Sequence, residues 1–152
     1  MPDQTTYGGP PNQMRPGAAA AIFDDAGRLL LQRRSDNGYW GLPGGGMDLG
    51  ESVAQTVVRE VREETGYEVE VVRLIGVYSD PAHSVINYPD GNRVQSIVCL
   101  FECRVVGGAP ALSDETTALE WFSLDALPRP FVPNHVVRIR DIRARQTAAF
   151  FR

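Results

Sequence analysis

The sequence predicts an α/β fold in which a mixed β-sheet lies between helices. Short apolar segments with the length and composition of strands occur in pairs along the chain. One amphipathic helix is expected in the first half of the chain, and a second helix is expected near the C-terminal end. Because strands and helices bury their apolar faces against one another, this order of elements favours a single domain built as a sandwich.

The first third of the chain predicts a tail followed by a hairpin. Residues 1–14 contain glycine and proline but no periodic apolar pattern, so a flexible tail is expected before a domain of residues 15–152. Residues 17–23 are small and apolar, which predicts a buried strand. Residues 24–27 have the composition of a turn, and residues 29–33 predict the strand that returns beside the first.

Residues 52–66 predict an amphipathic helix with defined ends. Ser52 and Gln55 have the spacing of a capping box at its start, and Gly66 is the residue expected just beyond its end. Four aliphatic residues recur at helical spacing and form the expected buried stripe: Ala54, Val57, Val58 and Val61.

The second half predicts three strands, a long loop and a helix. The strands are expected at residues 68–77, 94–106 and 119–123, with the second of them central in the sheet. Residues 80–93 predict a long loop or hairpin end, and residues 134–150 predict the helix. Its candidate buried positions are Val137, Ile139, Ile142 and Ala148. Its basic side chains are expected on a solvated face: Arg138, Arg140, Arg143 and Arg145.

Composition and charge exclude several classes of protein. The chain is 43% apolar and 22% charged, and its net charge of -4 argues against a protein that holds nucleic acid by its backbone. No apolar run has the length of a membrane span, and no secretion signal is evident. Cys99 and Cys103 would lie about 13 Å apart on one strand, too far to bridge. Two free thiols favour a cytoplasmic location. His83 and His135 are isolated and are expected to be surface or packing residues.

An acidic patch near the end of the first helix has no evident structural use. Glu60, Glu63 and Glu64 share one side of the helix, in its last two turns, where the helix dipole favours cations instead. A hard divalent cation would reverse this repulsion, because Mg2+ prefers oxygen ligands. The alternative is a solvated face in which Arg59 pairs with Glu63.

The surrounding residues resemble the Nudix box, Gly-x5-Glu-x7-Arg-Glu-U-x-Glu-Glu-x-Gly-U, in which U is a bulky aliphatic residue. The fixed positions are filled in register by Gly45, Glu51, Arg59, Glu60, Val61, Glu63, Glu64 and Gly66. Only the last position departs from the pattern, because it holds Tyr67, which can still pack as the first residue of a strand. The resemblance extends from about residue 16 to about residue 128 and implies the Nudix-type α/β/α sandwich.

The resemblance also implies a site and a cofactor. Glu60 is implied as a metal ligand or as the base that prepares the water, Arg59 and Glu51 as residues that orient the glutamates, and Arg34 as a phosphate-binding residue. The implied ligands of Mg2+ or Mn2+ are the carbonyl of Gly44 with Glu60, Glu63, Glu64 and, from a late loop, Glu115. Glu120 is the second choice for that late ligand.

The activity that the resemblance implies is hydrolysis of a nucleoside diphosphate linked to another moiety X, by attack of water on phosphorus. The expected partner is a small nucleotide, such as ADP-ribose, a nucleotide sugar or a dinucleoside polyphosphate, and not nucleic acid or a membrane. A homodimer is common in the family. The alternatives are a house-cleaning pyrophosphatase of oxidised nucleoside triphosphates and a catalytically silent domain that only binds a nucleotide.

Overall fold

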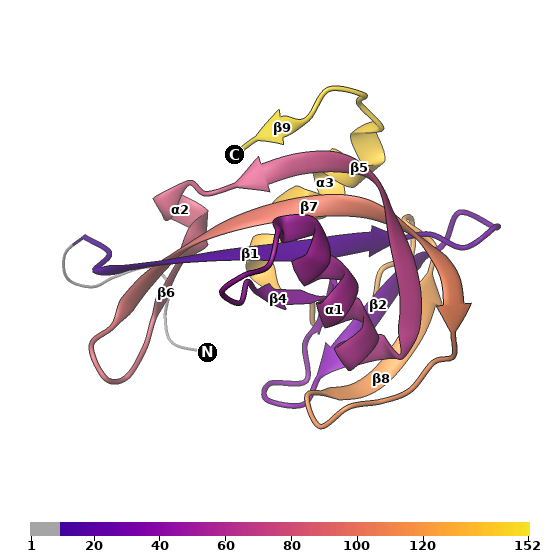
Figure 1. Cartoon of the computed structure of the whole chain (residues 1–152), viewed down its shortest axis with the longest axis horizontal. Helices are drawn as coiled ribbons and strands as arrows, with labels where there is room; N and C mark the ends of the chain where they lie inside the picture. Colours follow the sequence, from indigo (N-terminus) through magenta and orange to yellow (C-terminus); the bar gives the residue numbers. More distant parts are fainter. Residues whose placement is uncertain (1–9) are drawn as a thin grey trace.

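The computed structural model describes residues 10–152 and contains a six-stranded mixed sheet with a helix on each face (Figure 1). The strands β1 and β7 run parallel, as do β5 and β9, whereas the other neighbours in this sheet are antiparallel. The order is β4-β1-β7-β5-β9, and β6 pairs with β7. The bounds are β1 Gln13–Ile22, β4 Gly44–Gly46, β5 Tyr67–Tyr78, β6 Val85–Asn87, β7 Arg93–Gly108 and β9 Phe150–Phe151. The predicted mixed sheet, with residues 94–106 near its centre, is confirmed.

A second, three-stranded sheet was not predicted. It has the order β3-β2-β8 and consists of β3 Trp40–Gly41, β2 Leu29–Arg34 and β8 Thr116–Phe122. The predicted hairpin between residues 17–23 and 29–33 is therefore wrong, since these strands belong to different sheets and meet only at an isolated bridge between Phe23 and Leu29. The physical reason is that β4 and β7 already occupy both edges of β1.

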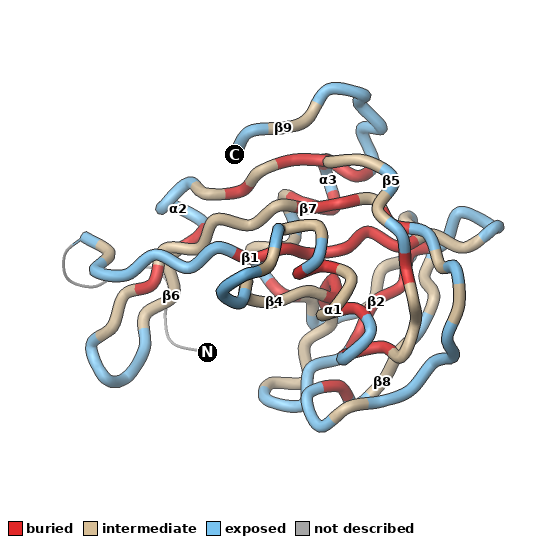
Figure 2. The backbone as a smooth tube through the Cα atoms, viewed as in Figure 1, coloured by how far each residue is buried: buried red, intermediate tan, exposed pale blue. Residues whose placement is uncertain are grey.

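The helices α1, Val53–Thr65, and α3, Val136–Ala144, cover opposite faces of the larger sheet. Ala18 and Ala20 of β1 pack in one core with α1, whereas Ala19 and Ala21 pack in the other core with α3. Alternate residues of a strand face opposite sides, so this run of small residues lets both helices approach the sheet. Figure 2 shows the buried residues concentrated in the middle of the sheet and the exposed ones in the connections.

The ends of the chain differ most from the prediction. Strand β1 starts at Gln13, inside the expected tail, and residues 1–9 of that tail lie outside the described residues. The expected loop at residues 80–93 contains a short helix, α2 Pro81–Ser84, and strand β6. The last helix follows a 3-10 turn, η1 Pro133–His135, and ends at Ala144.

The last helix stops early because the chain turns back toward the sheet. Arg145 adopts a left-handed conformation with φ of 50°, and Ala148, expected to be buried, is exposed. The following strand β9 then pairs with the edge of β5, where the backbone N–H of Arg152 donates to the carbonyl of Val77 at 2.9 Å. Among the described residues, no helix is long and apolar enough to cross a membrane.

Candidate metal and phosphate site

Helix α1 has the ends that the sequence predicts. The backbone N–H of Gln55 donates to Ser52 Oγ at 3.1 Å, and the backbone N–H of Ser52 donates to Gln55 Oε1 at 2.8 Å, which completes the capping box. Gly66 closes the helix with φ of 77°, and a Cβ there would lie 2.3 Å from the carbonyl oxygen of Ala109. These ends fix the register in which the acidic side chains leave the helix.

Arg59 links the acidic residues of this region. Its Nη1 lies 2.8 Å from Glu60 Oε1 and 3.2 Å from Glu63 Oε2, and its Nη2 lies 3.0 Å from Glu51 Oε2. Nη2 also donates to the carbonyl of Gly46 at 3.0 Å. The hydrogen bonds from Arg59 hold the pKa of Glu51 down at about 2. The guanidinium therefore lies where the sequence expectation placed it, between Glu51 and the glutamates of the helix.

Glu64 is the most buried carboxylate of the group, with 7% of its surface exposed. Its Oε2 accepts hydrogen bonds from Gln32 Nε2 and from the backbone N–H of Gly44, both at 2.9 Å. Burial raises its pKa to about 7, and the charges of Glu60 and Glu115 also raise it. Burial likewise raises the pKa of Glu60, where Glu63 and Glu115 add to the effect and Arg59 opposes it. The group thus concentrates negative charge that Arg59 only partly neutralises.

The donor set fits a hard divalent cation, since it offers carboxylate and carbonyl oxygens only. The glycine strand β4 lets the Glu60 carboxylate lie against its backbone, because a Cβ at Gly45 would lie 2.5 Å from the carboxyl carbon of Glu60. Within residues 10–152, however, no three acidic, histidine or cysteine side chains are already gathered as a ligand group. Glu63 and Glu115 are exposed, so they would turn inward on binding.

The late loop brings Glu115 to this patch. The backbone N–H of Ser35, just after β2, donates to the carbonyl of Glu115 at 3.0 Å. The charge of Glu115 acts on Glu60, Glu64 and Arg34. Glu120 lies farther along β8, opposite Leu31 of β2. The geometry therefore favours Glu115 as the late carboxylate.

Arg34 ends β2 beside the acidic patch but is already paired. Its Nε and Nη2 donate to the two carboxylate oxygens of Asp36, at 2.9 and 2.7 Å. The hydrogen bonds that Arg34 donates to Asp36 raise the pKa of Arg34, and the charges of Glu64 and Glu115 contribute. A phosphate at this position would have to share the guanidinium with Asp36.

Gln32, which the sequence analysis did not single out, is buried beside the patch. It donates to Glu64, and its Oε1 accepts from Thr116 Oγ1 at 3.1 Å, which ties the late loop to the helix. His135, expected to be a surface or packing residue, is half-buried, and its Nδ1 accepts from the backbone N–H of Leu42 at 3.1 Å. Desolvation lowers the pKa of His135. A polar residue directly after the apolar run Leu29–Leu31 is the one signal that could have identified Gln32.

Comparisons with known proteins identify the family of this chain. The family model described as the NUDIX domain matches residues 13–142. A MutT-like protein of Streptomyces ambofaciens is 36% identical over 123 residues, which are 81% of this chain and 73% of that protein. A Bacillus subtilis protein with the provisional name 8-oxo-dGTP diphosphatase is 37% identical over 84% of this chain and 78% of its own length. The crystal structure of an ADP-ribose pyrophosphatase from Streptococcus suis superposes with a TM-score of 0.67 and 33% identity, covering 91% of this chain and 97% of that one.

Proposed function

The chain belongs to the NUDIX family, and from this premise we propose that the carboxylate patch at the end of α1 is its catalytic centre. The protein is a Nudix hydrolase, which cleaves the pyrophosphate bond of a nucleoside diphosphate linked to a moiety X. The main support for this site is that Arg59 contacts Glu60 and Glu63, while Glu64 contacts the glycine strand β4.

Nudix hydrolases use divalent metal ions, and for this chain we infer Mg2+ or Mn2+. The bound ion supplies charge neutralisation at the phosphate oxygens. The groups proposed to hold it are the Gly44 carbonyl and the carboxylates of Glu60, Glu63, Glu64 and Glu115. Gly44 and Glu64 are already in contact through the Gly44 N–H, which supports their common role.

The remaining roles belong to side chains around those ligands. Arg59 and Glu51 are proposed to orient Glu60 and Glu63, which the hydrogen bonds of Arg59 support, and Glu60 is proposed to accept a proton from the attacking water. Arg34 is proposed to bind a phosphate of the substrate, because its guanidinium lies beside the proposed metal ligands Glu64 and Glu115 and can donate two parallel hydrogen bonds to an oxyanion.

The proposed substrate is a small nucleotide such as ADP-ribose, a nucleotide sugar or a dinucleoside polyphosphate. The Streptococcus suis protein of similar structure is named an ADP-ribose pyrophosphatase, which supports a small nucleotide as the substrate. The name of the Bacillus subtilis relative favours a second candidate, pyrophosphatase activity on oxidised nucleoside triphosphates. A silent nucleotide-binding domain is disfavoured, because every carboxylate of the box is present.

The experiment is a substrate screen with Mg2+ or Mn2+ and identification of the products, run beside Glu64→Gln and a chelator control. We expect cleavage between two phosphorus atoms of a small nucleotide. A better kcat/KM on capped or 5′-triphosphorylated RNA, with a steep dependence on salt, would contradict the small-molecule assignment. Activity that survives both Glu64→Gln and the chelator would contradict the site.

A further inference from the structure

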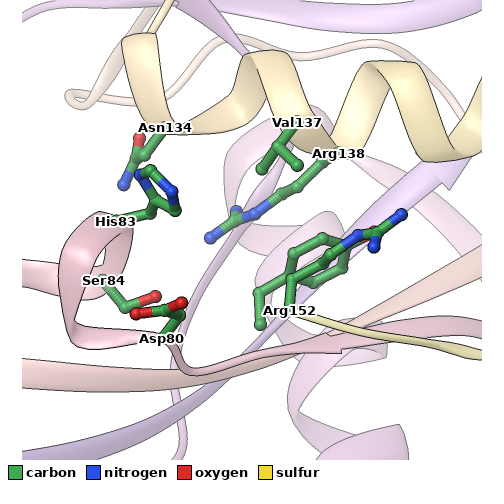
Figure 3. A pocket seen from close by; sticks show the side chains of 8 residues that line it. Asp80, His83, Ser84, Asn134, Val137, Arg138 and Arg152 are labelled. Carbon is green, nitrogen blue, oxygen red and sulfur yellow. The ribbon is translucent and has the colours of Figure 1, made fainter.

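A small polar pocket lies on the α3 face of the sheet, between α2, the end of β5 and the first turn of α3 (Figure 3). Its polar lining includes Asp80, His83, Ser84, Asn134, Arg138 and Arg152. The pocket occupies about 250 Å3 with its open mouth included, but its enclosed part holds only a group about the size of a water molecule. A ligand would therefore enter with one small polar group rather than with a ring.

Arg138 extends from α3 into this pocket (Figure 3). The side chain is 6% exposed, and within residues 10–152 its Nε has no hydrogen-bond partner and its guanidinium forms no ion pair. The guanidinium carbon lies 5.5 Å from the centre of the Tyr78 ring. A buried charge without an ion-pair partner destabilises the fold, because its desolvation is not compensated.

The nearby acidic residues form hydrogen bonds with groups other than Arg138. Asp141 accepts hydrogen bonds from Tyr78 Oη at 2.9 Å and from Arg152 Nη2 at 3.0 Å. Asp80 accepts from the backbone N–H of Ala82 at 2.9 Å, where it caps α2. Burial without an acidic partner lowers the pKa of Arg138 to about 10. The buried Oδ1 of Asn134 is also without a partner, so two unsatisfied polar groups line one pocket.

We propose that this pocket binds a small oxyanion, the oxygen end of a phosphate or carboxylate group, through the Arg138 guanidinium. The planar guanidinium presents parallel N–H donors that match such an anion. Ser84 and the amide of Asn134, which can present its nitrogen after rotation, line the same space. Asp80 also lines it, so its carboxylate weakens the binding of an anion and offers a way to tune it.

The anion has two possible sources, a distal group of the nucleotide substrate and a free phosphate ion. His135, next to Asn134, contacts the backbone of Leu42, and Gly44 is only two residues farther along the chain. Two residues span at most about 7 Å. Asn134 of the pocket is thus connected through His135 to the segment that leads into the glycine strand. Anion binding itself does not depend on the proposed catalytic function.

The test measures the binding of inorganic phosphate to the whole chain by calorimetry and thermal shift, with a chelator present and ionic strength held constant with sodium chloride. We expect phosphate to raise the melting temperature, and Arg138→Met to weaken phosphate binding at least about tenfold, the effect of losing a charge-assisted hydrogen bond. Without phosphate, Arg138→Met should melt no lower than the parent. Asp80→Asn keeps a good capping residue and should strengthen phosphate binding several-fold, whereas Asp25→Asn, an equal charge change in the turn after β1, should not.

The proposal is overturned if the parent does not bind phosphate or if Arg138→Met binds it as the parent does. If Arg138→Met does not fold, the pair of aspartate variants decides, and equal phosphate affinities in Asp80→Asn and Asp25→Asn overturn the proposal. Steady-state kinetics with added phosphate then distinguish the sources. If phosphate competes with substrate in the parent but not in Arg138→Met, the pocket binds a group of the substrate. If phosphate changes only kcat in the parent, and this change is lost in Arg138→Met, the pocket binds a separate phosphate ion.

Discussion

The helices α1 and α3 cover opposite faces of one sheet, and each buries charge in a different way. On α1, the buried Glu64 accepts two hydrogen bonds, and Arg59 forms ion pairs with four other carboxylates. On α3, Asp141 is 2% exposed and fully paired, whereas Arg138 is buried without an acidic partner. One face therefore carries an excess of negative charge and the other a positive charge without a counter-ion. Such buried charges destabilise the fold. On each face, this cost is consistent with a site where a ligand of opposite charge binds.

The largest expected effect comes from neutralising the buried charge on α1. Glu64→Gln should lower kcat/KM by more than about 100-fold, because even groups around metal ligands contribute 10- to 100-fold. The folded pKa of Glu64, about 7, lies above the ordinary value of 4.5 for a glutamate, so the folded state binds the proton more tightly and stability falls as pH rises through this window. At pH 8 without metal, Glu64→Gln should therefore melt at a higher temperature than the parent.

Kinetics and thermal denaturation with and without Mg2+ check both parts of this prediction. Glu102→Gln, on the sheet and away from the patch, is the matched control and should keep the parent activity. A Glu64→Gln protein that is inactive and also less stable at pH 8 would mean that Glu64 is a structural residue. The negative charge on the α1 face would then be explained by folding and not by a metal site.

A second variant tests whether the hydrogen bonds on Glu64 prepare it for a cation. Gln32→Leu removes one donor to Glu64 and the link to Thr116. We expect the concentration of Mg2+ needed for half-maximal activity to rise by about 10- to 100-fold, as for other residues that orient metal ligands. Saturating Mg2+ should restore most of kcat, which a general loss of folding would not allow. Gln95→Leu, whose side chain donates to the Ser79 carbonyl, is the control.

The α1 side could be predicted from the sequence because its interactions are local. Arg59 and Glu63 are four residues apart, and the capping box and Gly66 fix the helix ends within the same segment. The α3 side joins distant segments, since Tyr78 and Asp141 are 63 residues apart. The part of the α1 side that was missed is also long-range, since Gln32 and Thr116 are 84 residues apart. No spacing rule connects such residues. Arg138 was therefore expected on a solvated face, and this was wrong because Tyr78 and α2 cover it.

The same distinction explains the strands. Residues 94–106 are apolar enough to predict a central strand from their own sequence. The partner of residues 29–33 could not be predicted, because it depends on which strand edges remain free once β4 and β7 have paired with β1. The helix at residues 134–150 was predicted too long for a related reason. Its end is set by the pairing of β9 with β5, an interaction between distant segments.

A smaller effect is expected at the late loop, which approaches α1 from outside the box. Glu115→Gln should lower kcat/KM by about tenfold, at the lower end for groups around a metal, and Glu120→Gln should have less effect. The reason is that the charge of Glu115 acts on both Glu60 and Glu64. The two variants carry the same chemical change in neighbouring positions and are each other's control. Equal kinetics for Glu115→Gln and the parent would remove this residue from the site.

The smallest effect concerns His135, which ties α3 to the loop before the glycine strand. Desolvation lowers its pKa well below the ordinary value of 6.5 for a histidine, so below pH 6.5 the unfolded chain binds a proton that the folded chain excludes. Stability is therefore lost as pH falls, by up to about 1.4 kcal/mol per pH unit for this one group. His135→Asn keeps an acceptor for the Leu42 N–H without a titrating group, so its unfolding free energy between pH 6.5 and 5 should fall less steeply than that of the parent. His83→Asn, at an exposed position, should leave the slope unchanged. Parallel slopes for His135→Asn and the parent would show that His135 takes up its proton without unfolding, and the α3 side would then tolerate a second positive charge beside Arg138.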